Sequence, residues 1–157
     1  MRLAELVRLE RVTARLESQS KEDVLAELAG LLASGGDSSI DSAEFLRVLQ
    51  ARERLRSTGV GSGVAIPHGK VTSLNHLILA VGLSADGVDF DAADGEPVTI
   101  FMALAAPVGS TGDHLRALAR IARLCNDAEF RRRLLVCKTD EEAYETLVSE
   151  DEKQSGP

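Results

Sequence analysis

The sequence contains no tryptophan, and aromatic residues account for only 3% of its 157 residues. A core must therefore be built from the aliphatic residues that bring the hydrophobic share to 44%. No apolar run approaches the length of a membrane span, and the first segment, MRLAELVRLERV, is too polar for a signal peptide. We expect a cytoplasmic protein with a single domain at 1–150 and a frayed polar tail at 151–157.

Positive charge and cysteine are also scarce. The chain has 18 Lys and Arg against 25 Asp and Glu, for a formal net charge of −7. This balance argues against a nucleic-acid partner, which requires a clustered basic patch, although a local positive surface is compatible with it. Cys125 and Cys137 lie in apolar helical patterns without metal-ligand spacing, so we expect two buried thiols rather than a disulfide.

Hydrophobic patterning predicts several strands. Alternating residues favour a half-buried strand at 12–16, and a short apolar run at 64–66 is stopped by Pro67. The runs at 77–83 and 98–105 are almost continuously apolar, so both faces of these strands should be covered. The segment between them carries two turn signals, which fit either an antiparallel pair or a small extra strand at 88–90.

Helix starts are marked by a capping residue followed three positions later by an acidic one. These pairs are Ser20 with Asp23, Asp41 with Glu44, Asn126 with Glu129, and Thr139 with Glu142. The second of these helices should bury Phe45, Leu46, Leu49 and Leu55 on its inner side. The element order predicts an α/β (α+β) fold, with a single mixed sheet of about five strands flanked by about five or six helices.

The segment GVGSGVAIPHGK, residues 59–70, is the most unusual in the chain. Its glycines, Gly59, Gly61 and Gly63, lead into a strand, whereas a dinucleotide fingerprint leads into a helix, so a nucleotide site is disfavoured. Pro67 should end the strand, and Gly69 should let the chain turn away. His68 would then be presented at a strand end with cleared space around it.

Further candidate residues lie at helix ends. His114 follows GSTG and Asp113 at a predicted helix start, where free N–H groups favour anions and disfavour an imidazolium. His76 has no such setting and is expected to be exposed. The second helix ends with three arginines, of which Arg52 and Arg56 share a face and Arg54 does not. An arginine turned toward the site would bind phosphate oxygens.

Two histidines, an anion-binding helix start and a nearby arginine favour phosphoryl transfer through a histidine nucleophile. The alternative is a zinc ion bound by His68, His114 and Asp113, but no paired His spacing supports it. We expect neither a cofactor nor a metal.

RERLRSTGVGSGVAIPHGK at 52–70 and GVDFDAADGEPVTIFMALAAPVGSTGDHLRALARIARL at 87–124 resemble the IIA phosphocarrier domain of the bacterial sugar phosphotransferase system. Among IIA domains, the chain resembles the class that includes the fructose, mannitol and nitrogen-regulatory proteins. The likeness covers nearly the whole chain, from VTARLESQSKEDVLAELA through the EEAYETL helix. It implies that His68 accepts a phosphoryl group from a histidine phosphocarrier protein, that His114 supports the phosphorylated ring, and that Arg52 is the arginine ahead of the glycine segment. Family members often carry Asn or Glu where this chain has Ser62.

The likeness of IPHGK and HLRALARIARLCNDAEFRRRLL favours a nitrogen-regulatory protein over a mannitol one. Two functions stay open: a transfer intermediate that passes the phosphoryl group to a sugar-specific IIB component, or a switch whose phosphorylation changes its docking partner. We expect no direct membrane insertion.

We expect most acidic residues to face away from His68, and six of them fall in the last helix and tail: Glu141, Glu142, Glu145, Glu150, Asp151 and Glu152. The docking rim around His68 should therefore consist of small and apolar residues. This rim comprises Val60, Gly61, Val64 and residues 106–109, with Asp113 as its acidic member. Gly59, Gly63, Pro67 and Gly69 complete the expected docking loop.

Overall fold

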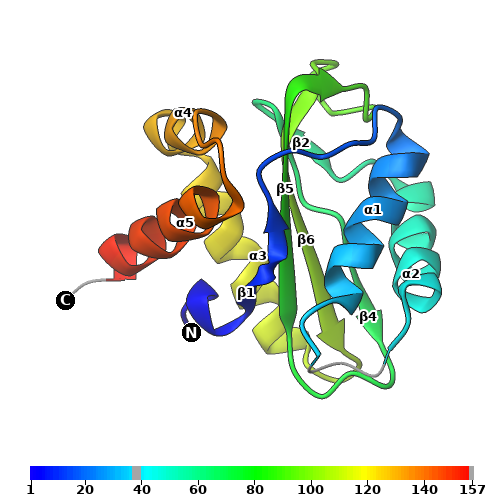
Figure 1. Cartoon of the computed structure of the whole chain (residues 1–157). Helices are drawn as coiled ribbons and strands as arrows, with labels where there is room; N and C mark the ends of the chain where they lie inside the picture. The colour runs from blue at the N-terminus through cyan, green and yellow to red at the C-terminus, as the bar shows by residue number, and fades with distance from the viewer. Residues whose placement is uncertain (37–39, 156–157) are drawn as a thin grey trace.

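The computed structural model describes residues 1–36 and 40–155, and it forms a mixed β-sheet with helices on both faces (Figure 1). Within these residues the sheet has six strands: β1 (Val7–Thr13), β2 (Gly59–Gly61), β3 (Val64–Ala65), β4 (His68–Val71), β5 (Ile78–Val88) and β6 (Val98–Pro107). A short 3-10 helix, η1 (Leu3–Glu5), and five α-helices complete the described chain: α1 (Lys21–Ala33), α2 (Ser42–Leu55), α3 (Thr111–Cys125), α4 (Ala128–Leu135) and α5 (Asp140–Ser155). The expected α+β class is confirmed.

The sheet order is β1-β5-β6-β3-β2, and β4 also pairs with β6. β5 and β6 are antiparallel, whereas β1 runs parallel to β5. β3 and β4 both lie parallel to β6, with β3 opposite Ile100 and Phe101 and β4 opposite 104–107. The break between β3 and β4 falls at Ile66 and Pro67, because proline has no N–H to give to the ladder.

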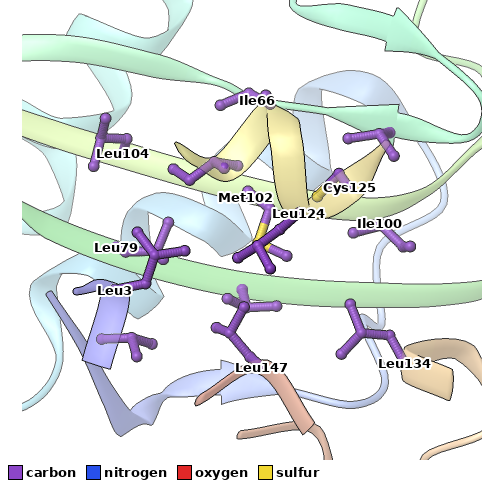
Figure 2. Packing of buried hydrophobic residues seen from close by; sticks show 14 of the residues in the cluster. Leu3, Ile66, Leu79, Ile100, Met102, Leu104, Leu124, Cys125, Leu134 and Leu147 are labelled. Carbon is purple, nitrogen blue, oxygen red and sulfur yellow. The ribbon is translucent and has the colours of Figure 1, made fainter. Parts of the chain in front are cut away.

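Alternate residues of β6 enter two hydrophobic clusters on opposite faces of the sheet. Ile100 and Met102 pack with Leu124 of α3 and Leu147 of α5 (Figure 2). Phe101 points into the cluster formed with α1 and α2. The prediction that both faces of the two apolar strands are covered is therefore confirmed.

Several predicted element boundaries are corrected. The first strand occupies Val7–Thr13 instead of 12–16; Leu16 lies beyond it, although its N–H still donates to the Leu83 carbonyl (2.8 Å). Val88 is the last residue of β5, so the antiparallel pair forms instead of an extra strand at 88–90. Leu55 is 82% exposed, because the buried face of α2 follows Phe45, Leu49 and Glu53 and Leu55 lies off this face.

Three of the four predicted caps are present. Ser20, Asp41 and Thr139 accept the N–H of the residue three positions on. Asp127 caps α4 in place of Asn126, accepting from Glu129 N (2.9 Å), while Asn126 closes α3. Asx side chains at neighbouring positions compete for one helix start, and the geometry favours the second here.

The predicted frayed tail at 151–157 is corrected, since α5 continues to Ser155 and residues 156–157 lie outside the described residues. Asp151 is buried because its carboxylate accepts the Leu3 N–H (2.8 Å) and pairs with Arg120 (2.5 Å). Cys125 is buried and Cys137 half-buried, and among the described residues both are free thiols. Burial raises the pKa of the Cys125 thiol to about 12.

Candidate functional site

The C-terminal turn of α2 leads into the site through a buried carboxylate. Glu53 accepts the Thr58 N–H (2.8 Å) at one oxygen and the Thr58 hydroxyl (2.6 Å) at the other. The Lys21 ammonium lies 3.1 Å from the first oxygen. These contacts fix the bend between α2 and β2, so Glu53 and Thr58 have a structural role within the segment RERLRSTG.

Backbone geometry accounts for the glycines that follow. Ser62 (φ 58°) and Gly63 (φ 78°) are the two central residues of a hairpin whose flanking residues, Gly61 and Val64, are paired. Positive φ at both central positions is the signature of the tight turn that matches strand twist. A Cβ on Gly59 would lie 2.8 Å from Cα of Ala92, so Gly59 allows a close backbone approach. The hairpin, not a nucleotide, requires these residues.

Pro67 and Gly69 position the histidine between them. The Pro67 carbonyl accepts the Leu104 N–H (2.9 Å), and His68 begins β4 opposite Leu104. His68 therefore begins a strand, whereas it was expected at the end of the preceding one. Gly69 does not provide a turn, because it lies within β4 opposite Ala105. A Cβ at this position would clash with Val48 of α2. The role of Gly69 is to let α2 pack closely on β4.

The tautomer of His68 is set by a backbone contact. Its Nδ1 lies 2.7 Å from the Ile66 carbonyl oxygen. A carbonyl accepts only, so Nδ1 carries the proton and Nε2 keeps a free lone pair. The half-buried ring therefore presents an unprotonated nitrogen, which is the form of imidazole that can act as a nucleophile.

His114 lies beside this ring. The two imidazoles are 5.4 Å apart between centroids and inclined at 81°. His114 is 7% exposed, and among the described residues its Nε2 is buried without a hydrogen-bond partner. A buried polar atom without a partner costs folding free energy, so Nε2 of His114 is a candidate hydrogen-bonding group for a ligand.

The start of α3 and the adjacent strand add positive potential. The Ser110 hydroxyl donates to the Pro107 carbonyl (2.6 Å) instead of capping an N–H of α3, which leaves the first turn available to an anion. Lys70, two residues beyond His68 on β4, donates to the Thr111 hydroxyl (3.1 Å). Lys70 was not predicted, although the period of a strand places it on the same face as His68.

Both histidines are held neutral. Burial is the main cause that lowers the pKa of His68, with the Arg52 charge lowering it further and the Ile66 carbonyl and Glu53 raising it. Burial also lowers the pKa of His114, assisted by the positive charge of His68 and Lys70. Neutral rings are the reactive and hydrogen-bonding forms at physiological pH.

Arg52 acts on the site through its charge. Its Nη1 donates to the Arg56 carbonyl (2.6 Å), which holds the half-buried side chain across the end of α2. Arg54 lines a separate hollow with Lys21 and Gln50. Arg52 and Arg54 therefore have different surroundings, and a difference in their roles stays a prediction.

The surface beside the site includes two exposed apolar residues, Val60 (61% exposed) and Val108 (58%). Gly61 and Val64 line a groove that Val60 shares with the C-terminal end of α3. Asp113 is exposed and pairs with Arg116. The expectation of a single acidic residue is corrected by Asp94, whose carboxylate accepts the Ser62 N–H (2.9 Å) beside Gly61.

The described residues contain no group of three or more His, Cys, Asp or Glu side chains that could hold a metal ion. The zinc alternative, with His68, His114 and Asp113 as ligands, therefore has no support there. Among the same residues, no helix is both long and apolar enough to cross a bilayer. The arrangement that remains is a neutral nucleophile, a buried hydrogen-bonding ring and nearby cations, which suits transfer of an anionic group.

Comparisons with known proteins agree with this geometry. The chain is 38% identical over 148 residues to a nitrogen regulatory protein of Bradyrhizobium diazoefficiens, covering 94% of this chain and 95% of that protein. It is 33% identical to the fructose-specific EIIABC component of Bacillus subtilis, covering 96% of this chain but only 24% of that longer protein. The crystal structure of the nitrogen regulatory protein IIA-Ntr from Neisseria meningitidis superposes with a TM-score of 0.85 at 34% identity, covering 92% of this chain and 98% of that one.

The family described as "Phosphoenolpyruvate-dependent sugar phosphotransferase system, EIIA 2" matches residues 5–150, which hold the sheet, His68, His114 and the first two thirds of α5. The chain therefore belongs to the EIIA 2 family of the phosphoenolpyruvate-dependent sugar phosphotransferase system.

Proposed function

We propose that the chain is a cytoplasmic histidine phosphocarrier whose His68 Nε2 accepts a phosphoryl group from a histidine phosphocarrier protein. The observation that carries this proposal is the Nδ1 contact with the Ile66 carbonyl (2.7 Å), which leaves Nε2 free beside His114. We further propose that residues 1–150 act as one IIA domain.

In this reaction the Nε2 lone pair attacks phosphorus, and the nitrogen–phosphorus bond of the donor breaks as the new one forms. The bonding electron pair returns to the donor ring. Nδ1 of His68 keeps its proton, so the phosphorylated ring is cationic and its N–H still donates to Ile66. Arg52, Lys70 and the start of α3 stabilise the three phosphoryl oxygens.

In the tautomer that carries its proton on Nε2, His114 can donate a hydrogen bond from this buried nitrogen to a phosphoryl oxygen. It therefore supports the phosphorylated state rather than forming the bond. His114→Ala should still be phosphorylated at His68 but should transfer the group onward poorly. Recovery of the phosphoryl group on His114 in mass mapping would reverse the two roles.

The experiment is phosphorylation by phosphoenolpyruvate, the first enzyme of the system and the histidine phosphocarrier protein. The parent should form an acid-labile, base-stable adduct, and His68→Ala should form none while keeping its thermal unfolding midpoint. His76→Ala is the matched control, since His76 is an exposed histidine and should label at the parent rate. Labelling of His68→Ala at the parent rate would refute the proposal.

We favour a regulatory, nitrogen-type role because the chain covers nearly the whole of a nitrogen regulatory protein at 38% identity. The alternative is a IIA component that passes the group to a sugar-specific IIB component; the fructose-specific relative supports it. Incubating the phosphorylated chain with a cysteine-bearing IIB protein separates the two. Rapid loss of the label to IIB favours sugar transport, and a stable adduct favours the regulatory switch.

A further inference from the structure

Glu53 is a buried carboxylate to which the proposed transfer assigns no step. It is 8% exposed and lies one residue beyond Arg52 at the end of α2. Both of its oxygens are engaged, one by Thr58 N (2.8 Å) and Lys21 (3.1 Å), the other by the Thr58 hydroxyl (2.6 Å). Burying a charge is costly unless it is paired and hydrogen-bonded, and these contacts satisfy that requirement.

These contacts lead to His68 through the backbone. Thr58 is itself buried, and its carbonyl accepts the Ile66 N–H (3.0 Å). The carbonyl of the same Ile66 accepts Nδ1–H of His68 (2.7 Å). Four residues are thus joined by consecutive hydrogen bonds, from a charged side chain on α2 to the ring that β4 presents.

The Pro67 carbonyl is held from the other side by Leu104 of β6. The Ile66 carbonyl therefore sits between two fixed points, Thr58 on one side and β6 on the other. Movement of the Thr58 backbone would move Ile66 and weaken its contact with Nδ1. The negative charge of Glu53 also favours a cationic His68 ring, the form that a phosphorylated ring with a protonated Nδ1 would take.

We propose that Glu53 is a positioning residue for His68: through Thr58 and Ile66 it holds the ring in the tautomer that carries its proton on Nδ1. The consequence for phosphoryl transfer rests on the proposed function, whereas the consequence for the tautomer concerns His68 alone. Losing one such hydrogen bond shifts a two-state ratio by about fivefold.

The competing explanation is that Glu53 only stabilises the fold, as buried paired carboxylates elsewhere do. Glu150 of α5 is a matched control, because it is 4% exposed and pairs with Arg133 and Gln154. Glu150→Gln should lower stability to a similar degree as Glu53→Gln. A purely structural role for Glu53 would give the two variants the same effect on His68.

The test measures imidazole nitrogen-15 chemical shifts of His68 at neutral pH, together with the rate of labelling by the phosphocarrier protein. The parent should show a protonated Nδ1 and a free Nε2. Glu53→Gln should increase the fraction of the other tautomer about fivefold and slow labelling by a similar factor. Glu150→Gln should leave both measurements at the parent values.

Thr58 supplies a second test in case Glu53→Gln fails to fold. Thr58→Val removes the hydroxyl that donates to Glu53 while keeping the shape, and it should shift the tautomer in the same direction. Thr58→Ser restores the hydroxyl and should return the ratio toward the parent. An unchanged tautomer in Thr58→Val and Glu53→Gln, or an equal shift in Glu150→Gln, would overturn the proposal. Shifted tautomers with a parent that takes no label would support the positioning role and refute the phosphocarrier function.

Discussion

Glu53 and Asp151 are buried carboxylates that each accept a backbone N–H and pair with a basic side chain, yet they serve different regions. Glu53 contacts Thr58, five residues along the chain, and Lys21. Asp151 contacts Leu3, 148 residues away, and Arg120. The first contact shapes a local bend that carries the site, whereas the second exists only when the whole fold has formed.

The difference indicates that chemistry and stability are divided between the two regions. Around His68 the structure tolerates an unpartnered buried nitrogen and positive φ at Ser62, both of which cost folding free energy. Both carboxylate oxygens of Asp151 have partners, although Nε of Arg133, which pairs with the neighbouring Glu150, is also buried without one among the described residues. Substitutions in the two regions should therefore affect different measurements.

The largest expected effect is at the Asp151 region. Asp151→Ala should lower the free energy of unfolding by about 3 kcal/mol, because it leaves Arg120 and the Leu3 N–H without their buried partner. Urea unfolding measures the change. Glu152→Ala, which removes an exposed pairing with Arg2 (65% and 56% exposed side chains), should cost under about 0.5 kcal/mol. If the folded fraction of Asp151→Ala were phosphorylated more slowly than the parent, the Asp151 region would contribute to chemistry as well as to stability.

Arg52 tests the site region with little expected change in stability. Arg52→Gln should slow phosphoryl transfer in both directions by about tenfold, since a charge-assisted contact with the phosphoryl group is lost. Arg54→Gln is the control on the same helix and should retain the parent rate. Equal slowing in stopped-flow transfer assays would show that general positive charge matters instead of one placed guanidinium.

His114 should lower the free energy of unfolding by an amount that depends on pH. Folding lowers the pKa of His114, so the unfolded chain binds more protons and stability falls as pH drops below about 6.5. His114→Leu removes this loss and the unpartnered Nε2. It should therefore raise stability by about 1 kcal/mol at pH 8 and by more at pH 5.5. A variant less stable than the parent at pH 5.5 would contradict this account.

The smallest effect concerns the hairpin. Ser62→Asn should raise the free energy of unfolding by about 0.5 kcal/mol, because Asn adopts positive φ more readily than Ser. Labelling should be unaffected, which thermal denaturation and the transfer assay would check together. Ser62 suits such a test better than Gly61, where φ is 106° and any side chain adds strain.

Local signals made much of the fold predictable. The capping pairs at Ser20 and Asp41 act within one helical turn, and the apolar runs of β5 and β6 depend on burial alone, so both were found. β4 was missed as a strand because its pairing with β6 is non-local and Pro67 interrupts the pattern. The helical continuation to Ser155 was missed for the same reason, since the contact that buries Asp151 comes from Leu3.

The site was predictable to the level of the motif. The proline and glycine flanks pointed to His68, and the helix start pointed to His114. Their proximity was implied by the family resemblance but not by either local pattern, because it depends on how α3 packs beside β4. Neither the tautomer of His68 nor the role of Gly69 could be predicted, because the first depends on one carbonyl and the second on the approach of Val48. The two-residue spacing between His68 and Lys70 could have placed Lys70 on the same strand face as His68, but β4 was not predicted as a strand.

The Leu3–Asp151 hydrogen bond also determines how this domain can be joined to others. Figure 1 shows the N-terminal segment and α5 on the same side of the sheet, where the Leu3–Asp151 hydrogen bond joins them. Residue 3 therefore lies beside residue 151 of α5, and a short peptide linker between the two terminal segments should allow the chain to be closed into a ring. Circular permutants opened in the exposed turn at Asp94 and Gly95 should fold, because no strand pairing is cut. The same geometry should allow this domain to be inserted into a loop of another protein without forcing the two sides of that loop apart.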